Sequence, residues 1–301
     1  MRKVIIPEPF DATDAQMKAY DLWKSFEKEI LYKTRYYVVH PLLEQLREYL
    51  LNNELRIVEG ELFYRARIIT DSAQKDYMMK VCVDEDGDYK RFLSKKNKFK
   101  GLTKEASYVP PDNLVIKDGR ANPRYIKYLY MAESPTTAIY EVRPLITDRI
   151  NVSEIVVKNE LKIANLTFDY YSVVPEKRDE TQWLLYFVHR AFSIPTIDPD
   201  EYLPSQIIAE NIKQWGYDGI RYNSSLHRGG VNVTVFDYEK CDAVSSRDMI
   251  IESVKLDART AGDLTIDDNM LFIKDNESYL VNVNDIKNKI KIPKHKKYEN
   301  E

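Results

Sequence analysis

The chain has 301 residues, of which 44% are hydrophobic and 31% charged, and its formal net charge is −3. This composition is that of a globular chain rather than a disordered one, and the small negative charge argues against a dedicated nucleic-acid binder. The two cysteines, Cys82 and Cys241, are too few for a disulfide framework or a cysteine-ligated metal site. Because the sequence contains no signal peptide and no run long enough to span a membrane, we expect a cytoplasmic protein.

The first 55 residues are predicted to be helical. Apolar side chains recur at helical spacing over residues 12–33, and a second helix is expected to begin at Pro41. A region of this length is short for an independent core.

The same region contains TRYYVVHP, which places Arg35 and His40 five positions apart. This spacing resembles that of HEPN-type ribonucleases, in which a histidine acts as acid–base and an arginine as phosphate ligand. Pro41 follows the histidine directly and disfavours one continuous helix through both residues. In the alternative interpretation, Arg35 and His40 pack the helical region against the core.

Residues 61–69 (ELFYRARII) alternate in polarity and predict a strand with Phe63, Arg65 and Arg67 on one face. Arginines on a strand face indicate a sheet edge or a pocket, because an unpaired buried charge is costly. Residues 71–101 are rich in charge and are expected to form a surface excursion.

Residues 119–144 (GRANPRYIKYLYMAESPTTAIYEVRP) predict a strand, a turn and a short helix. Tyr130 lies on the alternating strand, and Ser134 followed by Pro135 is a typical helix start. The helix spans about two turns and carries Glu141. It is too short to be stable alone, so other parts of the fold must hold it.

Further elements are predicted along the rest of the chain: strands at 153–157 and 161–166, helices at 179–193 and 204–215, a strand–loop–strand unit over 216–237, and a hairpin over 269–283. Helices followed by mixed strands and helices predict an α+β fold. We expect three parts: a helical region (1–55), a catalytic domain (56–245), and an extension with a hairpin and a basic tail (246–301).

Polar residues suited to chemistry occur in three separate segments: the strand with Arg65, the 119–144 unit, and the loop that holds Ser224, Ser225 and Asn232. Histidine pairs at ligand spacing, a Gly-x-Ser-x-Gly elbow and a phosphate loop are all missing from the sequence. The sequence therefore gives no support to a histidine metal site, to serine hydrolase chemistry or to nucleotide binding through a phosphate loop.

The three segments LFYRARI, GRANPRYIKYLYMAESPTTAIYEVRP and GYDGIRYNSSLHRGGVNVTVF resemble the signature blocks of the RES domain family, over about residues 56–240. The family is named for an arginine, a glutamate and a serine, and many members are toxins of bacterial toxin–antitoxin pairs. The resemblance implies an ADP-ribosyltransferase-like mixed β core with flanking helices. It also implies NAD as substrate, inorganic phosphate as a possible co-substrate, and a protein antitoxin that occludes the active site.

The resemblance places the family's arginine on Arg65, its glutamate on Glu141 and its serine on Ser224. Asn223 stands where the family usually has a proline before that serine. Because Ser225 is adjacent, either Ser224 or Ser225 could be the serine of the family.

Within the same resemblance, Tyr130 joins these three as a catalytic residue. The expected NAD contacts come from Arg65, Arg120, Asn122, Tyr130, Ser225 and Asn232. Purely structural alternatives stay open, since Arg120 and Asn122 could support a loop and Asn232 could hold the serine loop.

The implied reaction cleaves the nicotinamide–ribose bond, with phosphate or water as acceptor and without a metal. Glu141 is expected to stabilise the positive charge that develops on the ribose, Arg65 to bind the pyrophosphate, and Tyr130 to stack on the nicotinamide. Transfer of ADP-ribose to a protein target is an alternative, and a non-catalytic binding module is another.

Overall fold

The computed structural model describes residues 13–69, 98–110, 115–170, 172–194, 199–254, 270–275 and 277–282. The chain divides into a larger compact unit, Asp14–Val254, and a smaller one that combines Met1–Thr13 with Lys255–Glu301. In the smaller unit, β9 (Met270–Asp275) pairs with β10 (Glu277–Asn282) as the predicted hairpin.

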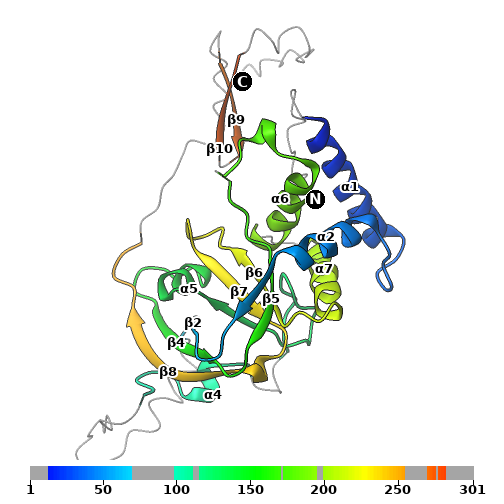
Figure 1. Cartoon of the computed structure of the whole chain (residues 1–301). Coiled ribbons are helices and arrows are strands. Elements are labelled where there is room, and N and C mark those ends of the chain that lie inside the picture. Colours follow the sequence, from blue (N-terminus) through cyan, green and yellow to red (C-terminus); the bar gives the residue numbers. More distant parts are fainter. Residues whose placement is uncertain are drawn as a thin grey trace, which may run out of the picture. The chain divides into compact units, whose positions relative to one another are not determined.

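Four long helices form one layer of the larger unit: α1 (Asp14–Tyr32), α2 (Pro41–Asn52), α6 (Glu180–Ser193) and α7 (Leu203–Gln214). Their apolar faces follow helical spacing, and they pack with Ile220 and Tyr222 of the sheet in one buried cluster. Figure 1 shows this layer together on one side of the sheet. The two helices predicted within the first 55 residues are therefore present as α1 and α2, and they pack against the domain core.

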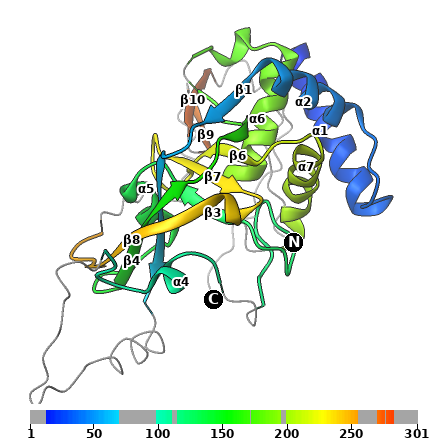
Figure 2. The same ribbon diagram turned by 60° about the horizontal axis from the view of Figure 1, so that its bottom comes forward.

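The other helices among the described residues are short: α4 (Lys104–Ser107), α5 (Pro135–Glu141), and the 3₁₀ turns η1 (Pro175–Lys177), η2 (Pro199–Tyr202) and η3 (Tyr238–Lys240). Among them, α5 packs against β2, β3, β4 and β7 of the sheet. Figures 1 and 2 show it apart from the layer of long helices.

The larger unit contains one eight-stranded sheet: β1 (Glu54–Ile57), β2 (Leu62–Ile68), β3 (Leu129–Ala132), β4 (Arg149–Val157), β5 (Leu161–Asn165), β6 (Gly219–Asn223), β7 (Val231–Val235) and β8 (Cys241–Ile250). Its strand order is β1-β5-β6-β7-β3-β2-β4-β8. The β5–β6 pair is parallel, with α6 and α7 in its crossover, and the other neighbours are antiparallel. The predicted α+β class is confirmed.

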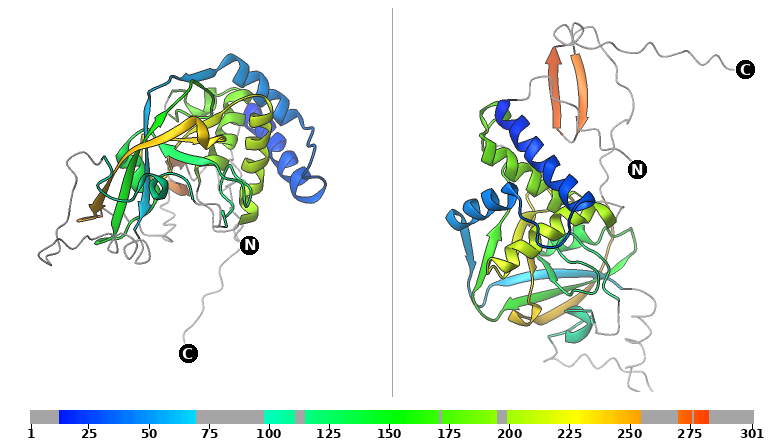
Figure 3. Two further views of the ribbon diagram at one scale, coloured as in Figure 1. Left: turned by 90° about the horizontal axis from the view of Figure 1, so that it is seen from below. Right: turned by 90° about the vertical axis from the view of Figure 1, so that its right-hand side faces the viewer.

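The sheet curves around a second apolar cluster. That cluster contains Ile57 of β1 together with Cys241 and Ala243 of β8, although these strands lie at opposite ends of the sheet order. Side chains from both ends can share one core only if the sheet bends strongly, and its curvature is visible in Figure 3. One face of the sheet thus forms its own core, and the other face supports the helices.

The sheet is weakly paired at its middle. β2 pairs with β4 along its whole length, but it pairs with β3 at the single position Tyr64↔Ala132. Beyond this position the two strands lack the regular ladder, so side chains can enter between them. The candidate site lies at this opening.

Among the described α-helices and strands, β1, α4 and β8 were not predicted from the sequence, and neither were the 3₁₀ turns η1, η2 and η3. β1 and α4 have only four residues each, and the sequence of edge strand β8, CDAVSSRDMI, mixes small, polar and apolar residues without regular alternation. β8 also runs through the expected boundary at residues 245–246. Because its pairing with β4 rather than its composition defines it, a reading of local pattern did not find it.

Candidate functional site

Glu141 is the last residue of α5, and local signals place it there. The Ser134 hydroxyl caps the helix by accepting a 3.1 Å hydrogen bond from the backbone N–H of Thr137, and Pro135 occupies the first helical position. A helix of seven residues is unstable alone. It is held here because Thr137 and Ala138 are buried against the sheet.

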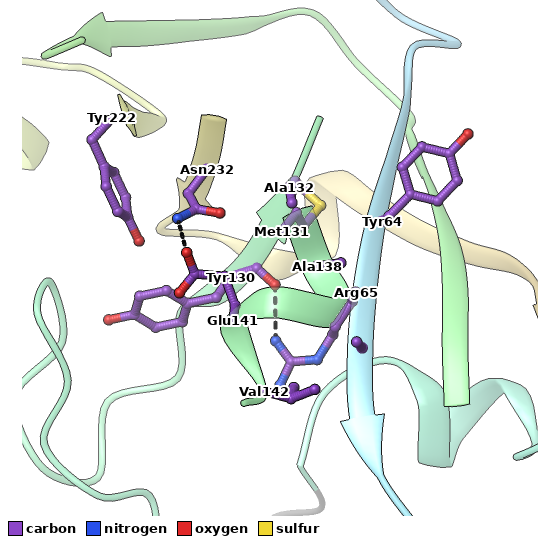
Figure 4. Close-up of a pocket in the computed structure, with 11 residues that line it drawn as sticks. Tyr64, Arg65, Tyr130, Met131, Ala132, Ala138, Glu141, Val142, Tyr222 and Asn232 are labelled. Atoms are coloured by element: carbon purple, nitrogen blue, oxygen red, sulfur yellow. Dashed lines mark hydrogen bonds between the residues drawn. The ribbon is translucent and has the colours of Figure 1, made fainter. Parts of the chain in front are cut away.

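Two buried polar side chains converge on the Glu141 carboxylate. The Ser224 hydroxyl donates to Glu141 Oε1 at 2.6 Å, and the Asn232 amide Nδ2 donates to the same oxygen at 2.7 Å. Asn232 lies on β7 and Ser224 directly follows β6. Figure 4 shows Asn232 and Glu141 facing each other. The second and third signature blocks therefore meet at one carboxylate.

Of the two adjacent serines, Ser224 is the one that contacts Glu141. Its hydroxyl also accepts the backbone N–H groups of Leu226 and His227, at 3.2 and 3.1 Å, so it organises the loop that it begins. Ser225 is exposed. This geometry favours Ser224 as the serine of the third block.

Arg65 fills the opening between β2 and β3. Its Nη1 atom donates to the backbone carbonyl of Tyr130 at 3.0 Å, which replaces the missing ladder contact between the strands. The Nε atom is buried and has no hydrogen-bond partner in the described part of the chain. Burial lowers the pKa of Arg65 to about 9, and the neighbouring Arg67 contributes to this lowering. Arg65 is therefore a cation near pH 7 with unused hydrogen-bonding capacity.

Arg67 lies two residues further along the strand and its Nη2 atom donates to the backbone carbonyl of Tyr108 at 3.4 Å. Burial lowers the pKa of its guanidinium. The contact joins β2 to the segment that follows α4, so Arg67 has a structural partner there.

The Tyr130 hydroxyl is engaged within the protein. It donates to Asn122 Oδ1 at 2.7 Å and accepts the backbone N–H of Ala121 at 3.1 Å, and burial raises the pKa of the phenol. The Asn122 amide Nδ2 in turn donates to the carbonyls of Lys117 and Pro123. Asn122 thus has the contacts of a loop-stabilising residue, and Tyr130 presents its ring rather than its hydroxyl.

Arg120 and Tyr222 approach each other near the same site. Burial raises the pKa of the Tyr222 phenol, while a hydrogen bond and the positive charge of Arg120 act against this increase. The Glu141 charge contributes to the increase, which places the phenol of β6 close to the carboxylate. The half-buried Arg120 is therefore a cation beside the Tyr222 phenol.

Arg65, Tyr130, Glu141, Tyr222 and Asn232 line a cavity of about 150 Å³. It is lined by Tyr64, Arg65, Ala66, Tyr130, Met131, Ala132, Ala138, Glu141, Val142, Tyr222 and Asn232. Figure 4 shows the Arg65 guanidinium and the Glu141 carboxylate on the same side of β2. The structure therefore brings together four of the predicted site residues, Arg65, Tyr130, Glu141 and Asn232, and Ser224 reaches them through Glu141.

Four residues near the site were not predicted from the sequence: Thr137, Tyr140, Tyr222 and His227. The His227 Nδ1 atom lies 2.9 Å from Thr137 Oγ1, and its ring stacks on Tyr140. His227 is a single histidine in a polar loop, so no spacing to a second functional residue could have identified it from the sequence. Tyr222, however, alternates with Arg221 in GIRYN and could have been placed on the face that leads to Ser224.

Arg35 and His40 do not form a joint site. His40 caps α2: its Nδ1 atom accepts the backbone N–H of Leu42 at 3.2 Å, and its Nε2 atom lies 3.0 Å from Ser25 Oγ. Burial lowers the pKa of this imidazole. Arg35 is exposed in the connection before the helix. The packing interpretation therefore fits the buried His40 but not the exposed Arg35.

Outside this cavity, a hollow of about 450 Å³ lies beside edge strand β8. It is lined by Lys98, Lys100, Glu154, Val244, Ser245, Ser246 and Arg247, none of which belongs to the predicted site. Across the part of the chain that the structure describes, we find no cluster of three or more side chains suited to a metal ion. A search of the same residues finds no helix with the length and apolar character needed to cross a bilayer.

Comparison with known proteins identifies the family. The RES domain family matches residues 98–257, just over half of the chain, and this protein belongs to that family. The matched range includes Arg120, Tyr130, Glu141 and Ser224, but it begins after Arg65, whose family assignment stays a prediction. No curated protein matches the chain. A similar solved structure is the M. tuberculosis MbcT–MbcA toxin–antitoxin complex, with 14% identity, 69% of this chain and 91% of that chain covered, and a TM-score of 0.36.

Proposed function

We propose that this chain is an NAD-degrading enzyme that cleaves the nicotinamide–ribose bond. The observation that carries the proposal is the convergence of Ser224 and Asn232 on the Glu141 carboxylate, beside a cavity that Arg65 also lines. In a RES domain protein this is the residue set expected for that reaction.

The carboxylate is suited to the charge that the reaction creates. Breaking the bond between nicotinamide and ribose leaves an oxocarbenium-like sugar, as in glycoside hydrolysis. Within the described part of the chain, both hydrogen bonds to Glu141 are accepted by Oε1, so we propose that Oε2 accepts one from a ribose hydroxyl. A carboxylate fixed in this way stabilises developing positive charge without reorganising.

The cavity suits one flat ring. Its volume of about 150 Å³ is similar to that of cavities that hold a benzene-sized molecule. We assign it to the nicotinamide, with the rings of Tyr130 and Tyr222 as walls. The rest of the dinucleotide then lies outside the cavity.

Two arginines provide positive charge for the phosphates. Arg65 lines the cavity assigned to the nicotinamide, and we assign its guanidinium to the pyrophosphate where the dinucleotide leaves that cavity. Arg120 lies near Tyr222 and can contact either the pyrophosphate or an incoming phosphate. We assign Asn122 to the support of this loop rather than to NAD, because its side chain is already fully engaged.

The acceptor decides the product. Inorganic phosphate would give nicotinamide and ADP-ribose 1-phosphate, water would give nicotinamide and ADP-ribose, and a protein nucleophile would carry the ADP-ribose itself. We favour phosphate because Arg65 lines the same cavity as Glu141 and Arg120 lies beside Tyr222, another residue of its lining. The reaction as proposed involves no metal.

The family also suggests the biological setting. Because many RES proteins are toxins, we propose that this chain depletes NAD in a bacterial cytoplasm. We further propose that a protein antitoxin restrains it by covering the cavity.

The test is incubation of the purified full chain with NAD, with and without phosphate, while nicotinamide is measured. We expect release that depends on phosphate and is absent in Glu141→Ala. Release without phosphate would indicate hydrolysis, and a labelled macromolecule would indicate transfer. A folded protein that leaves NAD intact under all conditions would contradict the proposal, and RNA breakdown in that sample would favour the ribonuclease alternative.

A further inference from the structure

The loop of residues 224–230 is attached to α5 at two separate places. At the start of the loop, Ser224 donates to Glu141 in the last turn of the helix. In the middle of the loop, His227 Nδ1 lies 2.9 Å from Thr137 Oγ1 in the first turn, and the imidazole stacks on Tyr140 with ring centroids 4.9 Å apart and planes 9° apart. The loop therefore covers the helix along most of its length.

The three helix residues that receive the loop share one face. Tyr140 and Glu141 follow Thr137 by three and four positions, which is the spacing of neighbours on a helix surface. Thr137 Oγ1 also lies 2.8 Å from the hydroxyl of Ser134, the residue that caps the helix. His227 is thus connected to the beginning of α5, whereas Ser224 is connected to its end.

The loop has the shape needed for this contact. The backbone N–H of Gly230 donates to the His227 carbonyl at 2.9 Å, and the Ser224 N–H donates to the Gly230 carbonyl at 2.8 Å. A Cβ atom on Gly230 would lie 2.7 Å from Thr137 Oγ1 and 2.8 Å from His227 Nδ1. Only glycine lets the loop approach the helix closely enough for the histidine to reach the threonine.

We propose that His227 is a positioning residue, which clamps the loop onto α5 and so holds the Ser224 hydroxyl at hydrogen-bond distance from the Glu141 carboxylate. This inference rests on the proposed function of Glu141. His227 does not line the cavity, so it acts through the loop rather than on a ligand. Because α5 has only seven residues, the orientation of its carboxylate depends on such contacts from neighbouring segments.

The clamp contains a hydrogen bond and a ring stack, and matched variants separate them. His227→Asn places an amide atom near the position of Nδ1 but removes the ring. His227→Phe keeps a ring for Tyr140 but removes the hydrogen bond. We infer that the hydrogen bond to Thr137 is the essential part, since it links the loop to the capped end of the helix. Thr137→Val and Thr137→Ser test it from the helix side.

The experiment measures two quantities in the full chain: kcat and KM for NAD, and the rate of amide hydrogen exchange in residues 224–230. We expect His227→Phe and Thr137→Val to lower kcat about tenfold with KM within about twofold. The same variants should speed up exchange, because the N–H groups of Leu226 and His227 lose protection. His227→Asn and Thr137→Ser should stay close to the wild type in both measurements.

The two readouts keep this inference separate from the proposed function. If the wild type does not consume NAD, the proposed function fails, and exchange still tests the clamp. Faster exchange with unchanged kcat would refute the positioning role. Unchanged exchange in both His227→Phe and Thr137→Val would refute the clamp itself.

Discussion

Asn232 and Glu141 are 91 positions apart in the chain, yet the amide of one donates to the carboxylate of the other at 2.7 Å. Asn232 belongs to strand β7 and Glu141 to helix α5, and β3 lies beside β7 in the sheet. The carboxylate is therefore fixed from the sheet rather than from its own helix. The predictions below follow from this arrangement and from the contacts around it.

Removal of the Glu141 charge should abolish NAD consumption without unfolding the protein. We expect Glu141→Ala and Glu141→Gln each to lower turnover by at least about 100-fold, the usual effect of losing a charge-stabilising group. Glu141→Ala should also lose about 1–3 kcal/mol of stability, because the buried Asn232 amide loses its acceptor. Glu141→Gln keeps an acceptor oxygen and should lose less.

Nicotinamide release and circular dichroism measure the two effects. Glu160→Gln makes the same chemical change at an exposed residue and should behave like the wild type. Full activity in a folded Glu141→Ala protein would contradict the role assigned to the carboxylate.

Arg65→Lys should weaken NAD binding although the charge is retained. Lysine cannot contact both an anion and the Tyr130 carbonyl with one rigid group, so we expect KM for NAD to rise about tenfold or more. Arg67→Lys is the matched control on the same strand face and should change KM little. An unchanged KM in Arg65→Lys would show that this guanidinium does not bind the phosphates.

Tyr130→Phe should affect stability more than activity. The change keeps the ring at the cavity but leaves the Ala121 N–H and the Asn122 side-chain oxygen without their partner. We expect the free energy of unfolding in urea to fall by about 1–3 kcal/mol, with KM for NAD changed less than about threefold. Tyr125→Phe, at a residue that is 66% exposed, should leave both unchanged. A large rise in KM would instead assign the hydroxyl to the ligand.

Stability should decrease on acidification because of His189, a buried residue of α6. Burial lowers the pKa of this imidazole to about 4, below the ordinary value of 6.5. The unfolded chain therefore binds more protons between pH 6.5 and 4, and stability falls as the pH falls through that range. We expect a loss of about 2 kcal/mol from this group between pH 7 and pH 5.

Urea unfolding at the two pH values measures the loss, and His189→Gln should remove this part of the dependence. Burial also lowers the pKa of His40, so His40→Asn measures the separate share of that histidine in the pH dependence of stability. If wild type and His189→Gln lose the same stability on acidification, the histidine is not the cause.

Local sequence signals predicted the parts of the fold that local physics determines. Ser134 and Pro135 marked the start of α5, and alternation marked the strands that carry Arg65 and Tyr130. Edge strand β8 was missed because its pairing with β4, and not its composition, makes it a strand.

The candidate site was predictable as a set of residues but not as a geometry. The register of β7 against β3 decides that Asn232 reaches Glu141, and no local pattern encodes this register. The opening of the sheet decides that Arg65 reaches the Tyr130 carbonyl. Support of a loop by Asn122 was one of the alternatives that the sequence left open, whereas the contact between His227 and Thr137 could not be inferred from it.

The late position of β7 in the chain has a consequence for synthesis. β7 joins β6 to β3 and so connects the two halves of the sheet, but it is complete only at Val235. A growing polypeptide that has not yet released this strand from the ribosome can form neither the bridge between the halves nor the amide contact of Glu141. If the carboxylate acts as proposed, a shortened translation product that stops before residue 231 lacks the Asn232 amide and is expected to be inactive.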